Sequence, residues 1–279
     1  MSAKPLLIKV RNSFYALHLE ESDRDLVCER LNSFAEDEAK PDYINIFIKT
    51  VSASSGLFSE ADNEWEFKRD KIIFSSYFTR LVFNPNKREM RGFFRDQSQE
   101  ERPLNSVMQA VNAALRLAIE YDNREDSIIV HSSGAVVNGA GVVFTGDSGA
   151  GKSTIAKMFS PEEVISDEAT MLCAENERVT IEPMPIRHDG KIARFPPNSP
   201  PLKAIFILKQ SSKNKILPIK KSAAVNFLLS GLVQSIPLPE HTRRISETLL
   251  AVVGQTDCFE LQFTLDGGII PLIKNMFSK

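Results

Sequence analysis

The sequence predicts an α/β protein with α+β character, in which a C-terminal mixed β-sheet with flanking helices follows a smaller antiparallel α+β domain. Three observations support this prediction. A β-branched and aromatic run at 142–145 leads directly into a glycine-rich loop. A strong turn signal at 138–141 precedes that run, which makes it one arm of a hairpin. Short strand patterns separated by turn residues fill most of the first hundred positions.

The composition is that of an ordinary globular protein. The 279 residues are 42% hydrophobic and 25% charged, with a formal net charge of -2, so bulk charge gives no reason to expect a nucleic-acid partner. No apolar run has the length of a membrane span, and Met1–Val10 is too short and too charged for a secretory signal. Cys28, Cys173 and Cys258 are far apart and have apolar neighbours, as buried thiols in a reducing compartment have. We therefore expect a cytoplasmic protein without a membrane or nucleic-acid partner; a homo-oligomer stays open.

The first predicted domain, residues 1–100, is an antiparallel α+β unit. Its one helix follows a capping residue at Ser22 or Asp23 and carries apolar residues on one face. Its aromatic residues recur at strand spacing and are expected in the core, and no catalytic constellation is found here. The predicted strands are Pro5–Val10, Phe14–Leu19, Tyr43–Ile48, Glu64–Lys68, Lys71–Tyr77, Arg80–Phe83 and Met90–Arg95.

A polar stretch, Gln97–Arg102, is the best linker candidate, and it places the second domain at residues 103–279. Pro103 can start a helix that runs to about Tyr121 with one apolar stripe. Beyond it, extended segments and helices alternate, with an irregular basic stretch at 183–201. The predicted strands are Ser127–Val130, Ala135–Val137, Val142–Thr145, Val164–Ser166, Ala169–Cys173, Val179–Glu182, Leu202–Leu208, Ile216–Ile219 and Phe259–Leu265, and the predicted helices are Thr154–Phe159, Ser222–Val233, Glu240–Val253 and one from Asp266 to Phe277.

The loop after Thr145 fits the pattern G-x-x-x-x-G-K-[ST], which holds phosphate groups. Its glycines let the backbone curl so that N–H groups approach an oxyanion, and the following helix adds further free donors. The lysine can reach the β- and γ-phosphates, and the serine hydroxyl can hold Mg²⁺. The candidate nucleotide-binding residues are Gly146, Asp147, Ser148, Gly149, Ala150, Gly151, Lys152, Ser153 and Thr154.

Two acidic residues and a histidine are candidates for chemistry beside this loop. Asp167 follows an apolar strand, where a carboxylate can bind Mg²⁺ or accept a proton from an attacking hydroxyl, and Glu168 is its neighbour. The hairpin places the start of the strand that carries His131 across from the end at Thr145, so His131 can sit beside the γ-phosphate. We therefore take Asp167, His131 and Lys152 as candidate catalytic residues, and Ser153, Asp167 and Glu168 as candidate metal ligands.

Cations in the irregular stretch are weaker candidates. Arg187 and Lys191 can neutralise the charge of a transferring phosphoryl group, although solvated surface charge explains either residue equally well.

These residues resemble the HPr kinase/phosphorylase family, in the superfamily that also contains ATP-dependent phosphoenolpyruvate carboxykinases. The resemblance lies in His131 within V-H-S-S-G, in the loop spelled G-D-S-G-A-G-K-S, and in the acidic pair Asp167-Glu168. It covers about 127–170 clearly, continues loosely in the order of strands and helices to Lys279, and does not cover residues 1–103. The family usually has Asp-Asp where this chain has Asp-Glu, and the family's downstream signature for contacting HPr is not found.

The resemblance implies ATP and Mg²⁺ as cofactors and transfer of a phosphoryl group to a hydroxyl, often a serine of a protein or peptide. It suggests Lys152 and Ser153 for the triphosphate and metal, Asp167 as the base toward the acceptor hydroxyl, and His131 as a nearby polar partner. A nucleotide-binding regulator or assembly protein without transfer stays open, as do a small-molecule kinase and a bifunctional kinase/phosphorylase. The acceptor and the role of residues 1–100 are not given by the sequence.

Overall fold

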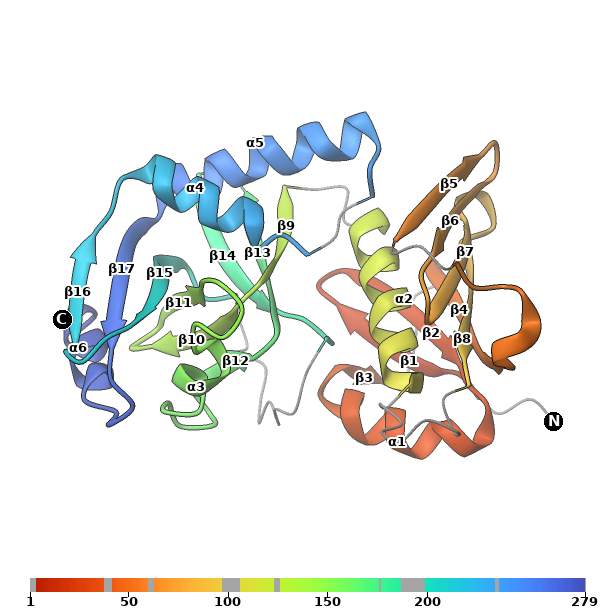
Figure 1. Cartoon of the computed structure of the whole chain (residues 1–279), viewed down its shortest axis with the longest axis horizontal. Helices are drawn as coiled ribbons and strands as arrows, with labels where there is room; N and C mark the ends of the chain where they lie inside the picture. The colour runs from red at the N-terminus through yellow and green to blue at the C-terminus, as the bar shows by residue number, and fades with distance from the viewer. Residues whose placement is uncertain are drawn as a thin grey trace. The chain divides into compact units, whose positions relative to one another are not determined.

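The computed structural model describes residues 4–37, 42–59, 63–96, 106–122, 126–175, 177–186, 199–233 and 236–278. The chain forms two compact units, Met1–Asp122 and Asn123–Lys279, and Figure 1 gives the labels of their elements. Both units contain mixed sheets with helices, so the α/β class is confirmed. None of the described helices combines the length and the apolar character needed to cross a membrane.

The first unit is one sheet in the order β3-β1-β2-β4-β8-β7-β6-β5, with α2 packed against its central strands. The sequence predicted a wholly antiparallel sheet, which is wrong, because β2–β4 and β4–β8 are parallel pairs. Between β2 and β4 the chain passes through α1, which returns it to the end of the sheet where β2 began. A crossover of this kind makes β2 and β4 parallel. The elements are β1 (Leu6–Val10), β2 (Ser13–His18), α1 (Glu21–Leu31), β3 (Ala35–Glu36), β4 (Tyr43–Val51), β5 (Glu64–Lys68), β6 (Lys71–Ser75), β7 (Thr79–Asn84), β8 (Glu89–Arg95) and α2 (Ser106–Asp122).

Helix α2 belongs to this first unit, whereas the sequence predicted a domain boundary at 100–103 and assigned this helix to the second domain. The compact units divide after Asp122, because the apolar side chains of α2 pack against β2, β4, β7 and β8. At its C-terminal end, Asp122 accepts a hydrogen bond of 3.0 Å from Arg88, and Arg88 also pairs with Asp42 at 2.7 Å. Burial of the apolar stripe and this ion pair together hold the helix on the sheet.

The second unit contains a six-stranded sheet in the order β12-β10-β11-β15-β17-β16 and a three-stranded sheet in the order β14-β13-β9. In the larger sheet β11, β15 and β17 are parallel, and the other pairs are antiparallel, so the predicted mixed sheet is confirmed. The elements are β9 (Ser127–His131), β10 (Ser133–Val137), β11 (Ala140–Thr145), α3 (Lys152–Ala156), β12 (Val164–Ser166), β13 (Ala169–Glu175), β14 (Arg178–Pro183), β15 (Leu202–Gln210), β16 (Lys215–Pro218), α4 (Lys221–Ser230), α5 (Pro239–Gln255), β17 (Asp257–Phe263) and α6 (Ile269–Met276).

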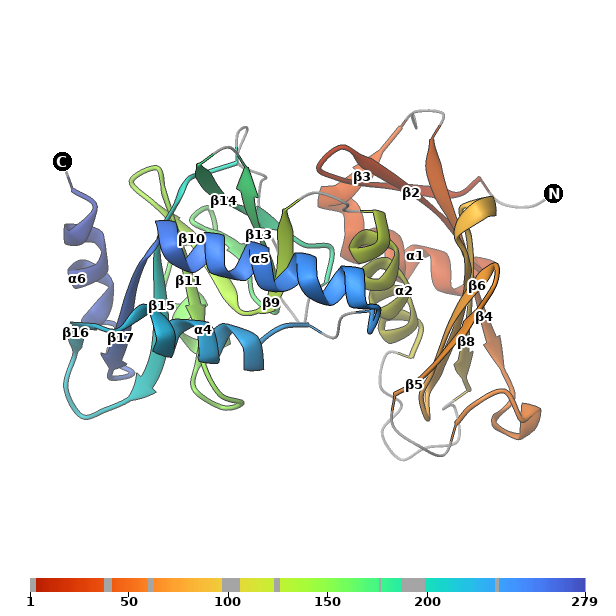
Figure 2. The same cartoon turned by 90° about the horizontal axis from the view of Figure 1, so that it is seen from above.

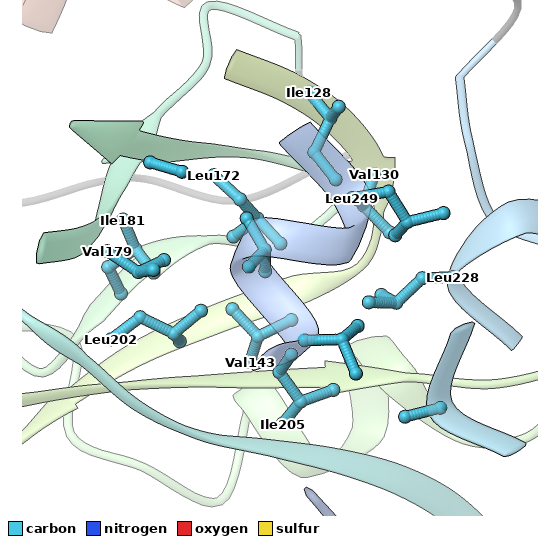
Figure 3. Packing of buried hydrophobic residues seen from close by; sticks show 14 of the residues in the cluster. Ile128, Val130, Val143, Leu172, Val179, Ile181, Leu202, Ile205, Leu228 and Leu249 are labelled. Carbon is cyan, nitrogen blue, oxygen red and sulfur yellow. The ribbon is translucent and has the colours of Figure 1, made fainter. Parts of the chain in front are cut away.

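Two apolar layers cover the two faces of the six-stranded sheet. On one face, the rings of Phe144 of β11 and Phe206 of β15 stack with their centroids 5.4 Å apart. They belong to an apolar cluster that also includes residues of α3 and α6. On the other face, Val143 and Ile205 meet Val130 of β9 and Leu249 of α5 (Figure 3). Helices α4 and α5 run side by side over this second layer (Figure 2). The strand that enters the glycine-rich loop is therefore buried on both faces, which fixes the position of its carboxyl end.

The hairpin between β10 and β11 sets the register of that strand. Asn138 and Gly139 both have positive φ, 51° and 80°, as a two-residue turn of the primed type requires. Ser133 then pairs with Phe144 and Val137 with Ala140. The turn signal read in the sequence is thus confirmed, and it brings the start of β10 level with the end of β11.

Replacement of Gly139 by Ala is expected to lower the free energy of unfolding of the second unit by about 1 kcal/mol, because a Cβ disfavours a φ of 80° even in open space. Gly254 of α5 is the matched control: it is helical, nothing lies within 4 Å of an added Cβ, and Gly254→Ala is expected to stabilise by up to about 1 kcal/mol. Denaturant titration followed by circular dichroism measures both changes. An equal effect of the two substitutions contradicts the assigned turn conformation.

Candidate functional site

The glycine-rich loop between β11 and α3 carries three glycines in conformations that other residues rarely adopt. Gly146 has a φ of 149°, Gly149 of 79° and Gly151 of 106°. The exposed residues Asp147 and Ser148 lie at its tip. The curled backbone that the motif predicts is therefore present, and such a curl directs N–H groups into a concave, anion-binding surface.

The helix after the loop is shorter than the sequence predicted. It runs from Lys152 to Ala156, whereas a helix at 154–159 was expected, and a turn follows it before Pro161. The hydrogen bond from the Met158 N–H to the Ile155 carbonyl at 3.1 Å has the i→i−3 pattern of a tightened last turn. A helix this short contributes little dipole, so the loop N–H groups and Lys152 carry most of the positive potential.

Lys152 is buried under the loop and points back at its own backbone. Its Nζ donates to the carbonyls of Gly146 at 2.9 Å and Asp147 at 3.1 Å, and the side chain is 7% exposed. Burial lowers the pKa of Lys152, and the negative charges of Glu168 and Asp147 act in the opposite direction. A phosphate group in the loop would place a further negative charge beside this buried ammonium and so favour its charged form.

The acidic pair forms the bend between β12 and β13, level with the end of β11. Gly134 pairs with Ser166 on one side and with Val143 on the other, and the Ser132 N–H donates to the Glu168 carbonyl at 3.2 Å. The negative charge of Glu168 raises the pKa of Lys152. In the described part of the chain, no group donates a hydrogen bond to Oδ1 of Asp167, although that oxygen is buried.

His131 ends β9 in the three-stranded sheet, beside this bend. Its Nδ1 lies 2.9 Å from the Glu168 carbonyl and 3.4 Å from Oε1 of Glu168. The Thr145 hydroxyl donates to the His131 carbonyl at 3.4 Å, which brings the histidine next to the residue that precedes the loop. The structure thus brings His131, Glu168 and Lys152 together around the end of β11.

The remaining candidates differ in what the structure says of them. Ser153 and Thr154 lie in the first turn of α3 and are exposed, so the Ser153 hydroxyl is accessible to a metal ion. Arg187 and Lys191 lie outside the described residues. Mg²⁺ usually keeps several waters and takes only one or two carboxylates besides phosphate oxygens, and a hydroxyl and a carboxylate of the kind that Ser153 and Asp167 supply have the chemistry of such a site.

Three residues that support the loop were missed by the sequence analysis. The Ser133 hydroxyl donates to the Lys152 carbonyl at 2.9 Å, and Nε2 of Gln210 donates to the Gly149 carbonyl at 3.0 Å. The ring of Phe263 lies against Gly151, with Cζ 2.7 Å from the position of an added Cβ. Gln210 and Phe263 end β15 and β17, and their place at the carboxyl ends of strands parallel to β11 is the signal that could have identified them.

Replacement of Gly151 by Ala is expected to disrupt the loop, because the methyl group would overlap the Phe263 ring and the φ of 106° disfavours any Cβ. Gly149→Ala meets nothing within 4 Å and carries only the conformational cost, so it is the control. If the loop binds Mg²⁺–ATP, as the sequence predicts, the affinity measured by calorimetry should fall by about tenfold more in Gly151→Ala than in Gly149→Ala, roughly the effect of 1.4 kcal/mol. When Phe263 is already replaced by Leu, adding Gly151→Ala should cost less affinity than it does in the wild-type protein. An equal cost in both backgrounds contradicts the steric explanation.

Comparison with known proteins identifies one family. The sequence model of the SynChlorMet cassette protein ScmC family matches residues 96–247, which is more than half of the 279 residues and includes the glycine-rich loop, the acidic pair and His131. None of the curated proteins compared with the chain matches it. The chain therefore belongs to the SynChlorMet cassette protein ScmC family.

Proposed function

We propose that this protein is an ATP- and Mg²⁺-dependent kinase that transfers the γ-phosphoryl group to a hydroxyl, namely a serine of a protein or peptide. The proposal includes an HPr kinase-like arrangement of the second unit around its phosphate-binding loop. The observation that carries it is the buried Oδ1 of Asp167, which has no hydrogen-bond partner in the described part of the chain and belongs to a bend level with the start of the loop. A buried carboxylate oxygen left unpaired costs free energy unless a ligand satisfies it.

Each residue has a role in this reaction. Lys152 and the loop N–H groups bind the β- and γ-phosphates, and the Ser153 hydroxyl and the acidic pair hold the metal ion. When bound, Mg²⁺ neutralises charge on the phosphate oxygens. Asp167 accepts the proton of the serine hydroxyl as its oxygen forms a bond to the γ-phosphorus, and the bond from that phosphorus to the bridging oxygen breaks to release ADP.

Glu168 and His131 are proposed to position the charges around this reaction. The ammonium of Lys152 is subject to the negative charge of Glu168, and His131 lies 3.4 Å from the same carboxylate. An arrangement of this kind fixes the lysine and the metal before the acceptor arrives, which is how most phosphoryl-transfer sites lower their barrier.

The test uses the full-length protein and ATP labelled on the γ-phosphate. Calorimetry should register Mg²⁺–ATP binding, and extracts or serine-containing peptides should acquire a label that mass spectrometry assigns to a hydroxyl. Tight binding without transfer to any acceptor would favour the nucleotide-binding regulator instead. A folded protein that gives no heat with Mg²⁺–ATP would end the proposal.

A further inference from the structure

The carboxyl ends of β15 and β17 lie on the side of the loop that faces away from the acidic pair. The strand order β12-β10-β11-β15-β17-β16 puts β11 between the two groups. Asp167 and Glu168 follow β12, on one side of β11, whereas β15 and β17 run parallel to β11 on the other side. Parallel strands end at the same edge of a sheet, so both ends reach the level of the loop.

Direct contacts join these two ends to the loop. Gln210, the last residue of β15, donates a hydrogen bond of 3.0 Å to the Gly149 carbonyl at the loop tip. Phe263, the last residue of β17, packs its ring against Gly151 at the end of the loop. A ligand that extends from the loop in this direction therefore meets the turns that follow Gln210 and Phe263.

Hydrogen bonds between side chains and backbone tie the two turns together. Oδ1 of Asn214 accepts from the Thr264 N–H at 2.9 Å, and Oδ1 of Asp266 accepts from the Thr264 hydroxyl at 2.6 Å and from the Gly268 N–H at 2.9 Å. Leu265 lies inside this bonded turn, and its side chain is 76% exposed. An apolar side chain on a fixed backbone can contact a ligand with little loss of conformational entropy.

We infer that the nucleoside part of the bound nucleotide lies over the carboxyl ends of β15 and β17, with its base against Leu265. This inference rests on the proposed function, in which the γ-phosphate faces Asp167 and Glu168. Because the phosphate chain is anchored with one end toward those acids, the nucleoside extends to the opposite side of β11. Ligands of open α/β sheets bind outside the carboxyl ends of the strands, and heteroaromatic bases are bound largely through apolar contact.

The two turns carry charges of both signs, because Lys213 and Asp266 are both exposed there. Hydrogen bonds from Thr264, Gly268 and Asn214 lower the pKa of Asp266. Charge therefore does not select the part of the nucleotide at these turns, and the apolar contact with Leu265 is what places the base there.

The test compares Mg²⁺–ATP with Mg²⁺–tripolyphosphate, which has the phosphate chain without the nucleoside. In Leu265→Ser, calorimetry should show ATP affinity about three- to tenfold weaker and tripolyphosphate affinity unchanged, because only the apolar contact is lost. Leu250→Ser is the control: Leu250 of α5 is 62% exposed, and both affinities should stay at the wild-type value.

The outcomes separate the inference from the proposed function. Suppose that the wild-type protein binds both ligands. If Leu265→Ser then leaves the ATP affinity unchanged, or lowers the affinities for ATP and tripolyphosphate equally, the nucleoside position alone is overturned. A wild-type protein that binds neither ligand overturns the phosphate-binding function and the inference with it. Photolabelling with an azido-adenine ATP analogue gives a second measurement, and the labelled peptide should contain Leu265.

Discussion

Replacement of Lys152 by Met is expected to lower phosphoryl transfer by about 10²–10³-fold and to weaken Mg²⁺–ATP binding by about ten- to a hundredfold. The substitution keeps an unbranched side chain of similar length and removes the ammonium that reaches the loop carbonyls at 2.9 and 3.1 Å. Calorimetry measures the affinity, and label transfer from γ-labelled ATP measures the rate. The matched control is Lys157→Met, because Lys157 directly follows the same short helix and is exposed.

The same lysine predicts how binding depends on pH. Burial lowers the pKa of Lys152 in the free protein, and the negative charge of bound phosphates raises it again. Between these two pKa values, binding takes up a proton, so ATP affinity falls as the pH rises through that interval. Calorimetry in buffers of different ionisation enthalpy should detect this uptake between the two pKa values in the wild type and in Lys157→Met. If Lys152→Met takes up as many protons on ATP binding as the wild type does, Lys152 does not contact the bound phosphates.

Replacement of Asp167 by Asn is expected to lower phosphoryl transfer by about 10²–10⁴-fold while Mg²⁺–ATP affinity changes by only a few-fold. The amide has the shape of the carboxylate, but it cannot accept the proton of an attacking hydroxyl. Single-turnover transfer and calorimetry separate the two quantities. Glu162→Gln provides the control, since Glu162 is exposed in the turn before β12. Unchanged transfer in Asp167→Asn would exclude Asp167 as the base.

The neighbouring carboxylate should behave differently. Glu168→Gln removes the charge that raises the pKa of Lys152, so the proton uptake on ATP binding should begin at a lower pH than in the wild type. Asp167→Asn should leave that onset unchanged. If the pH at which proton uptake begins shifts in Asp167→Asn but keeps its wild-type value in Glu168→Gln, the roles proposed for the two acids are reversed.

Several features of the site could be predicted from the sequence because they depend on a few adjacent residues. The turn at Asn138-Gly139 and the positive φ values of Gly146, Gly149 and Gly151 follow from conformational preferences that each residue carries with it. The position of β11 as one arm of a hairpin, and hence a mixed sheet, followed from the same local signals.

The sequence could not predict features that arise from pairing between distant segments. The parallel pairs β2–β4 and β4–β8, and the packing of α2 on the first sheet, depend on how an entire unit buries its apolar surface. The separate sheet that carries His131 depends on the pairing of β9 with β13, about forty residues later in the chain. An apolar helix stripe or an alternating strand has the same pattern whichever partner it covers.

By itself, the sequence determined that a curled, glycine-rich loop with a lysine at its end follows a buried strand, because backbone conformation at these positions is a local property. Only the tertiary structure decided which side chains surround that loop: Glu168 and His131 on one side, and Gln210 and Phe263 on the other. Those neighbours are set by strand order and register, which minimise the exposed apolar area of the whole sheet.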